Sequence, residues 1–240
     1  MRITEHTNPL RIIPPVMLCD KDLGDSVPAP LPNRAHFMAI IGNPGSGKSS
    51  FAISLLKQTG ENKMYRKVFH DIFLIVPPAS LASIKSNVFR NHPEDKIFPE
   101  LTADALQTIK DRALENAEHD YNTLIIIDDQ TVHLKQKSVE SALRDLIYNR
   151  RHYHISIWIL AQSYNQIPLS IRKTVSHFAL FKPRNKKEAE NIFEELIFLP
   201  KEDSETVMRH VYRGHHDFMF GVTDSGKLHR NFNELELSEE

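Results

Sequence analysis

Short apolar runs alternate with amphipathic segments along most of the chain. Residues 36–41 (HFMAII), 72–76 and 155–161 are nearly continuous apolar runs of strand length, which is typical of strands buried on both faces of a parallel sheet. Residues 101–118 carry apolar positions at helical spacing, with Thr102 as the expected N-cap. The alternation predicts an α/β fold in which helices cover both faces of a mainly parallel sheet.

The pattern continues to the C-terminus and predicts a closing hairpin there. The remaining elements are expected as a strand at 123–130, a helix at 138–152, a strand at 174–182, helices at 185–196 and 202–213, and hairpin strands at 216–222 and 228–232. The hairpin turns at Thr223–Gly226, and the acidic end ELELSEE is expected to be a solvated tail.

Proline density separates the first 34 residues from the rest. Pro9, Pro14, Pro15, Pro28, Pro30 and Pro32 exclude a long helix and a central strand there. We therefore predict an extended N-terminal arm over residues 1–34 and a single α/β domain over residues 35–240, a size that one such core commonly reaches.

Net charge, cysteine content and the lack of a long apolar run indicate which partners and which compartment to expect. The net charge of −1 gives no global basic surface for nucleic acid, so any DNA contact must be local. Cys19 is the only cysteine and has no internal partner, which favours a reducing compartment such as cytosol or a virion interior. The polar N-terminus and the lack of a long apolar run predict a soluble protein without a transmembrane segment.

The strongest motif is GNPGSGKS, from Gly42 to Ser49, which fits G-x-x-x-x-G-K-S between a predicted strand and a predicted helix. Its glycines allow the backbone to wrap around a polyphosphate, with N–H groups directed at the anionic oxygens. Lys48 would neutralise the β- and γ-phosphates, and the Ser49 hydroxyl would coordinate Mg²⁺. The predicted ATP-binding residues are Gly42, Asn43, Pro44, Gly45, Ser46, Gly47, Lys48, Ser49 and Ser50. A second S-G-K, at 225–227, lacks the glycine spacing and is assigned to the hairpin turn.

Two acids end the apolar strand at 124–127. Ligand-binding residues lie at the carboxyl ends of parallel strands, so Asp128 is expected to hold Mg²⁺ beside the phosphate loop and Asp129 to polarise the attacking water. The alternative is that both acids only cap the following segment.

Three further polar residues are candidates for catalysis. Gln162 follows the strand at 155–161 and would report on the γ-phosphate, unless it only terminates that strand. Arg150 and Arg151 end a helix, from which either could reach into a neighbouring subunit's site and stabilise the transition state. Each could instead simply place favourable charge at the helix C-terminus.

The phosphate loop, the IIIDD strand and the segment from Arg150 to Phe181 (RRHYHISIWILAQSYNQIPLSIRKTVSHFALF) together resemble the FtsK–HerA superfamily. Within it, the chain is most similar to the poxvirus-type packaging ATPases of nucleocytoplasmic large DNA viruses. The resemblance implies a P-loop NTPase fold of the ASCE/RecA-like type, with the Gln162 strand between the phosphate-loop strand and the IIIDD strand. Much of the superfamily carries glutamate where this chain has Asp129, a shorter carboxylate for the base role.

The resemblance also implies a homo-oligomeric ring that hydrolyses ATP with Mg²⁺ and drives double-stranded DNA into a viral capsid. Its partners would be DNA and capsid or portal-like vertex proteins, and it would act in the virion and at assembly sites in the host cytoplasm. Local basic clusters offer DNA contacts, although each is also typical of a solvated surface: Lys135 with Lys137, Arg172 with Lys173, and the set Lys182, Arg184, Lys186 and Lys187.

Other functions stay open from the residues alone. Asn185–Glu188 (NKKE) superficially resembles the guanine-reading N-K-x-D of a GTP-binding switch, but Glu188 is one methylene too long and no D-x-x-G follows Asp128. A nucleoside kinase would show an arginine-rich lid, which is not evident. A nucleotide-stabilised assembly protein without turnover is the non-enzymatic alternative.

Overall fold

The computed structural model describes residues 21–24, 27–82, 89 and 91–237. Cys19 and the first 20 residues of the predicted arm lie outside this part of the chain. Of the arm's described residues, Leu23 and Leu31 are buried against the domain core. The Tyr65 hydroxyl donates a hydrogen bond to the carbonyl of Pro32 at 2.8 Å. This part of the arm therefore packs on the domain.

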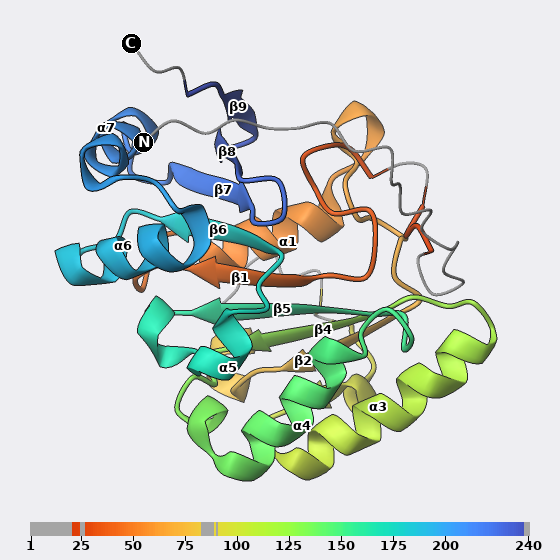
Figure 1. Cartoon of the computed structure of the whole chain (residues 1–240). Helices are drawn as coiled ribbons and strands as arrows, with labels where there is room; N and C mark the ends of the chain where they lie inside the picture. The colour runs from red at the N-terminus through yellow and green to blue at the C-terminus, as the bar shows by residue number, and fades with distance from the viewer. Residues whose placement is uncertain (1–20, 25–26, 83–88, 90, 238–240) are drawn as a thin grey trace, which may run out of the picture.

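Within the described residues the strands form one nine-stranded sheet, ordered β3-β2-β4-β5-β1-β6-β7-β8-β9 (Figure 1). The strands are β1 (Phe37–Ile41), β2 (Asp71–Ile75), β3 (Ile97–Phe98), β4 (Thr123–Asp128), β5 (Ile155–Ala161), β6 (His177–Phe181), β7 (Phe218–Val222), β8 (Lys227–Arg230) and β9 (Asn233–Leu235). Pairing is parallel from β3 to β6 and antiparallel from β6 to β9. The predicted α/β class, the closing hairpin and the position of β5 between β1 and β4 are confirmed.

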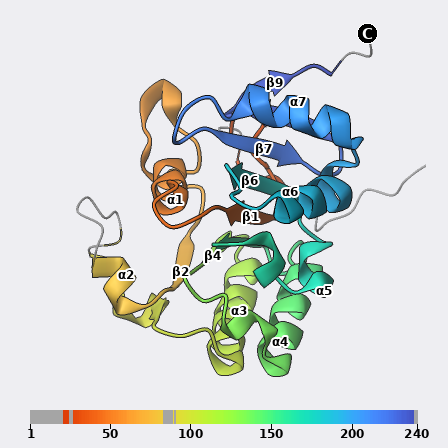
Figure 2. The ribbon, with the colours of Figure 1, turned by 90° about the vertical axis from the view of Figure 1, so that its left-hand side faces the viewer.

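Helices lie on both faces of the sheet. They are α1 (Lys48–Lys57), α2 (Pro78–Ala82), α3 (Ala103–Glu118), α4 (Lys137–Tyr148), α5 (Leu169–Arg172), α6 (Lys186–Ile192), the π-helical η5 (Phe193–Ile197) and α7 (Lys201–Val211), with short 3-10 turns η1 (Gly60–Asn62), η2 (Glu94–Lys96), η3 (His133–Lys135) and η4 (Tyr164–Gln166). Figure 2 shows α1 and α2 on one side of the sheet and α3 to α6 on the other. Thr102 caps α3 as predicted, because its side chain accepts from the amide of Ala105 at 3.1 Å. No described helix is both long enough and apolar enough to cross a membrane.

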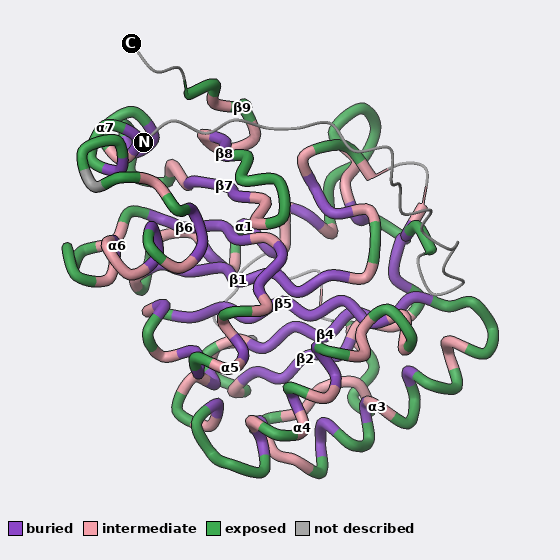
Figure 3. The backbone as a smooth tube through the Cα atoms, in the orientation of Figure 1, coloured by how far each residue is buried: buried purple, intermediate pink, exposed green. Residues whose placement is uncertain are grey.

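The core divides into two layers because successive strand residues face opposite sides of the sheet. Ile157 and Ile159 of β5 belong to the layer beneath α3 and α4, whereas Trp158 and Leu160 belong to the layer beneath α1. All of β5 is buried (Figure 3). Burial on both faces fixes the strand register, so the residues that follow each strand end are held at defined positions.

One expectation at the C-terminus was wrong. The segment ELELSEE does not begin as a solvated tail, because Asn233–Leu235 forms β9 and pairs with β8. The partly buried Leu235 packs against the main core. An edge strand needs pairing on one side only, so a short polar segment with a single apolar anchor can form one.

Candidate functional site

The phosphate loop joins β1 to α1, and its glycines are required for different reasons. Gly45 and Gly47 have φ angles of 75° and 114°, in the left-handed region that side chains disfavour. Gly42 is instead crowded, since a Cβ there would lie 2.5 Å from Ser46 Oγ and 2.7 Å from Phe181 Cβ. The last residue of β6 therefore packs against the start of the loop and sets its shape.

Lys48 is buried at the first position of α1, inside the loop. Its ammonium donates to the carbonyls of Gly42 at 2.7 Å and Asn43 at 3.2 Å. Burial lowers the pKa of Lys48, and the charges of Asp128 and Asp129 oppose that shift. The ammonium is thus held at the centre of the loop, where phosphate oxygens would gain most from a positive charge.

Asp128 ends β4 and lies opposite the next residue of α1. The Ser49 hydroxyl donates to Asp128 Oδ2 at 3.0 Å. Burial raises the pKa of Asp128, and the neighbouring charge of Asp129 raises it further. A hydroxyl and a carboxylate are the hard oxygen donors that Mg²⁺ prefers, and a divalent cation would offset the charge of the two adjacent acids. Ser49 and Asp128 therefore fit the magnesium site predicted for them.

Asp129 is held in a strained position beside two polar side chains. Its φ of 55° is left-handed, which Asp tolerates better than most residues. Ser80 Oγ donates to Asp129 Oδ2 at 2.9 Å, and Gln162 Nε2 approaches Oδ1 at 3.5 Å, the long limit of a hydrogen bond. Strained backbone at a strand end is common in active sites, and here it aims the carboxylate along the same edge as Lys48.

The sequence analysis missed Ser80, which contacts the candidate site, and Gln130, which supports the chain beside it. Ser80 lies in α2, just after β2, and the β2-β4 pairing brings it beside Asp129. Gln130 is buried and fixes the chain after Asp129. It accepts from the amide of Leu101 at 3.1 Å and donates to the carbonyl of Pro99 at 3.1 Å. Comparing the polar residues that follow every predicted strand would have found Ser80.

The structure brings together Lys48, Ser49, Asp128, Asp129 and Gln162 at the carboxyl ends of the central strands, here the carboxyl edge. It places Arg150 and Arg151 at the amino ends of the same strands, here the amino edge. Both arginines precede β5, whose first residue pairs with the first residue of β4. Arg150 Nη1 donates to the carbonyl of Ile147 at 2.8 Å, near the end of α4. Within its own chain Arg150 therefore stabilises a helix C-terminus and does not reach the phosphate loop.

The predicted basic clusters also differ from one another. Arg172 makes a bidentate ion pair with Glu195, at 2.7 Å for each contact, and its side chain is mostly buried. Tyr164 donates to the same carboxylate at 2.9 Å. This network joins α5 to η5, so Arg172 is a structural residue. Lys182 and Arg184 are instead exposed and line a pocket beside the phosphate loop.

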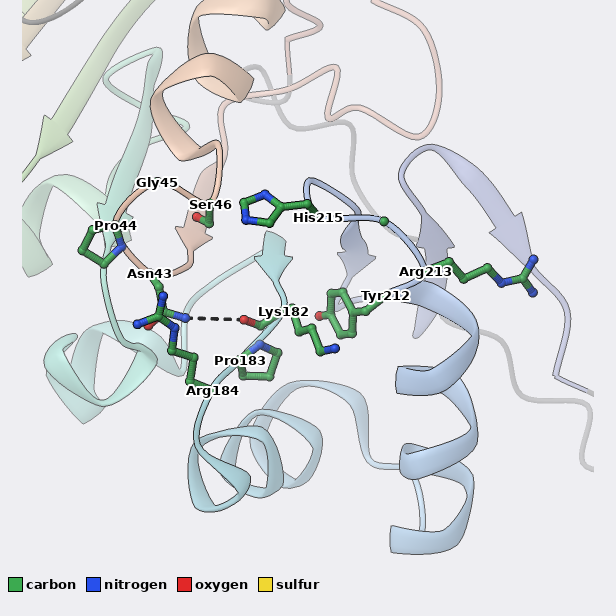
Figure 4. Close-up of a pocket in the computed structure, with 11 residues that line it drawn as sticks. Asn43, Pro44, Gly45, Ser46, Lys182, Pro183, Arg184, Tyr212, Arg213 and His215 are labelled. Atoms are coloured by element: carbon green, nitrogen blue, oxygen red, sulfur yellow. Dashed lines mark hydrogen bonds between the residues drawn. The ribbon is translucent and has the colours of Figure 1, made fainter.

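That pocket, here the flank pocket, has a volume of about 550 Å³. Its walls are the phosphate loop, the segment after β6 and the segment after α7, and Figure 4 shows the side chains that line it. The described lining residues are Asn43, Pro44, Gly45, Ser46, Lys182, Pro183, Arg184, Tyr212, Arg213, Gly214 and His215. A second hollow, of about 220 Å³, lies on the other side of the loop and includes Ser49, Ser80, Asp128 and Asp129 among its lining residues.

The segment that resembled a guanine-reading motif has structural partners. Asn185 Oδ1 accepts from the amide of Lys187 at 2.9 Å and so caps α6. Glu188 Oε1 accepts from the amide of Tyr164 at 2.6 Å. Both side-chain oxygens therefore serve the local fold, which counts against a GTP-binding switch.

A known protein family covers most of the chain. The family model described as "Poxvirus A32 protein" matches residues 29–209. No curated protein sequence matches the chain.

Solved structures show the same fold at low sequence identity. The chain is similar to B204, the DNA-packaging ATPase from Sulfolobus turreted icosahedral virus, with a TM-score of 0.58 and 18% identity over 82% of this chain and 97% of that one. The B204 genome packaging NTPase of Sulfolobus turreted icosahedral virus 2, in complex with ATP-gammaS, matches with a TM-score of 0.58 and 17% identity over 84% and 98%. The cytoplasmic domain of the Thermomonospora curvata type VII secretion ATPase EccC matches with a TM-score of 0.51 and 11% identity over 85% and 26%. At these identities the similarity concerns the fold alone.

Proposed function

Because the chain belongs to the poxvirus A32 protein family, we propose that it is an ATP-hydrolysing motor subunit that moves double-stranded DNA into a viral capsid. One observation carries the proposal. The phosphate loop, both acids and Gln162 follow the adjacent parallel strands β1, β4 and β5, and this arrangement supports the proposal. Hydrolysis of a triphosphate needs a phosphate cradle, a cation site and a group that orients water, and each has a candidate at the carboxyl edge.

The residues divide the chemistry among them. The loop amides and Lys48 would bind the β- and γ-phosphates, and Ser49 and Asp128 would hold Mg²⁺, which when bound neutralises charge developing on the phosphates. Asp129, which Ser80 and Gln162 contact, would orient the attacking water and accept its proton. Gln162 follows β5, so a change at the γ-phosphate would reach the segment after that strand.

The oligomer and its partners are part of the proposal. A homo-oligomeric ring would supply Arg150 or Arg151 to the neighbouring subunit's site, which suits their distance from the phosphate loop of their own chain. The packaged DNA would pass through the ring, a capsid or portal-like vertex protein would anchor it, and the protein would act in virions and at cytoplasmic assembly sites. The DNA-packaging role of B204, a protein with the same fold, supports this assignment.

DNA-stimulated phosphate release, measured over a range of protein concentrations, tests the motor. Since an arginine acting in trans requires assembly, the rate per subunit should rise with concentration. Adding Arg150→Ala or Arg151→Ala subunits to wild type should lower the rate for whichever arginine acts in trans. A chain that binds ATP but never hydrolyses it, with or without DNA, would instead be a nucleotide-stabilised assembly protein.

A further inference from the structure

The turn between α7 and β7 packs against the phosphate loop, which is far from it in the sequence. His216 of this turn contacts the carbonyl oxygen of Ser46 through Nδ1 at 3.0 Å. A carbonyl oxygen only accepts hydrogen bonds, so Nδ1 carries a proton and donates it. In Figure 4 the ring of the neighbouring His215 also lies beside Ser46. The loop therefore has a side-chain partner outside its own strand and helix.

The hydrogen bond from His216 fixes the orientation of one peptide group of the loop. In a planar trans peptide the C=O and N–H groups point in opposite directions. Because the Ser46 carbonyl points toward His216, the Gly47 amide points away from the turn that carries His216. Gly47 is the N-cap of α1, and N–H groups at the start of a helix are free to bind anions. His216 thus orients an amide that a bound phosphate could use.

Without an outside partner this peptide group could turn over. Gly47 has a φ of 114°, and glycine adopts positive and negative φ about equally readily. Turning over the peptide between Ser46 and Gly47 changes mainly ψ of the first residue and φ of the second, so β1 and α1 need not move. The loop therefore depends on an external contact to keep this amide in one orientation.

The turn that carries His216 is itself firmly held. The Asp217 carboxylate accepts from two backbone amides of the turn, at 3.1 and 2.6 Å. It also accepts from the Arg230 guanidinium of β8 at 3.0 Å. These contacts join the turn to the C-terminal hairpin, whose first strand pairs with β6. The hairpin therefore provides a fixed support from which His216 can hold the loop.

We propose that His216 is a positioning residue for the phosphate loop, which keeps the Gly47 amide directed at the triphosphate and links the phosphate site to the C-terminal hairpin. This inference rests on the proposed function, since it concerns the same phosphate site. His216 acts through the peptide between Ser46 and Gly47 and does not itself contact the nucleotide. Because the ring is exposed and makes one hydrogen bond to the loop, its loss should weaken phosphate binding moderately and not abolish it.

Calorimetric titration of the full chain with Mg²⁺ and inorganic tripolyphosphate measures binding to the loop alone, because this ligand carries no nucleoside. His216→Leu and His216→Asn form a matched pair, since both side chains branch at the same atom and only asparagine has an N–H where Nδ1 donates. His216→Leu is expected to weaken tripolyphosphate and ATP binding by the same factor, about three- to tenfold, as the loss of one hydrogen bond would. His216→Asn should bind both ligands within about twofold of wild type.

The amide resonance of Gly47, measured by NMR in the free protein, gives a readout that a general effect on the fold would not move selectively. It should shift in His216→Leu and stay near its wild-type position in His216→Asn. Both variants are also made together with His215→Ala, so that the adjacent ring cannot replace His216, and the same difference between them is expected. His152→Leu, at an exposed position of the amino edge, is the control and should change neither measurement.

The other outcomes overturn the inference or the proposed function separately. Equal tripolyphosphate binding by the two His216 variants, or an unchanged Gly47 resonance in His216→Leu, would overturn the inference, and the proposed function would stand if Lys48→Ala abolishes binding. A loss seen only together with His215→Ala would assign the role to the pair of rings and overturn it as well. A loss for ATP alone would mean that His216 contacts the nucleoside, which also overturns it. If wild type binds neither ligand, the proposed function itself fails.

Discussion

The carboxyl ends of the central strands place Lys48, Asp128 and Asp129 close together, whereas the amino ends of the same sheet bury histidines and use an arginine to cap a helix. At the carboxyl edge, the Asp128 and Asp129 charges oppose the effect of burial on Lys48. The nearest partners of these three side chains are carbonyl, hydroxyl and amide groups that a ligand could displace.

The buried histidines of the amino edge are neutral and have fixed partners. His36 is almost fully buried, accepts from Trp158 Nε1 at 2.8 Å and contacts the carbonyl of Arg34 at 2.8 Å. Burial lowers the pKa of His36 to about 3 and that of His177 to about 4, and Arg150 adds to the second shift. The carboxyl edge therefore keeps charged groups where a ligand could bind, whereas the amino edge keeps its buried histidines neutral.

The largest expected effect comes from Asp129 at the carboxyl edge. Asp129→Asn keeps the shape of the side chain but removes the proton acceptor, so ATP turnover should fall by about 100-fold or more while ATP still binds. Phosphate release and equilibrium binding, measured on the same preparation, check both parts. Arg150→Ala is the comparison from the amino edge, and its effect should depend on assembly. Unchanged turnover in Asp129→Asn would remove the base role.

Gly42 tests the shape of the loop. In Gly42→Ala the new methyl group would clash with Ser46 and with Phe181 of β6, so ATP affinity should drop about tenfold and the free energy of unfolding by about 1–3 kcal/mol. Gly60→Ala is the control, because Gly60 has a φ of 66° but no atom within 4 Å of the place its new methyl group would take. It should cost stability through backbone strain and leave ATP affinity unchanged. Equal ATP affinities for the two variants would contradict the crowding argument.

The buried histidines of the amino edge make the stability of the fold depend on pH. A histidine with a lowered pKa takes up its proton in the unfolded chain first, so the free energy of unfolding should fall as the pH drops from 6.5 toward 4. Each such proton contributes a slope of up to about 1.4 kcal/mol per pH unit. The raised pKa of Asp128 acts in the opposite sense, since the folded chain then holds the extra proton.

Urea unfolding at several pH values measures this slope. His177→Gln should reduce it by up to one proton, because that histidine no longer titrates between the folded and unfolded states. His152→Gln, at an exposed position, provides a matched control. An unchanged slope in His177→Gln would show that this buried histidine does not set the acid limit of the fold.

Ser80 should give the smallest effect. Ser80→Ala removes one hydrogen bond to Asp129, worth about 1 kcal/mol, so kcat should fall about three- to tenfold with ATP affinity unchanged. Ser141→Ala, on the exposed face of α4, should alter neither quantity. A change in ATP affinity without a change in kcat would mean that Ser80 acts on the loop and not on the carboxylate.

Local sequence predicted the parts of the molecule whose role depends on their immediate neighbours. Gly42 to Ser49 could be predicted as a phosphate loop because the strand, the loop and the helix are consecutive in the sequence. Asp128 could be predicted as a magnesium ligand because its strand ends in acids. The position of β5 between β1 and β4 came from family resemblance, since apolar runs carry no information on lateral order. Thr102 was assigned from its own cap signal.

The rest depends on packing between distant segments. Phe181 shapes the phosphate loop only because β6 lies beside β1, and His216 reaches Ser46 only because β7 adds next to β6. Ser80 belongs to the site through the β2-β4 pairing. For Arg150 the sequence left two roles open, because a residue after a helix can cap it or act in catalysis. In the fold of one chain, Arg150 caps the helix.

A structure with a nonhydrolysable ATP analogue and Mg²⁺ tests most directly whether the carboxyl edge binds a triphosphate. The account predicts phosphates surrounded by the amides of Gly42–Ser49, Lys48 against the terminal phosphates, and the metal between Ser49 and Asp128. A nucleotide bound elsewhere, or a loop closed by side chains with Lys48 turned away from Asp128, would contradict it.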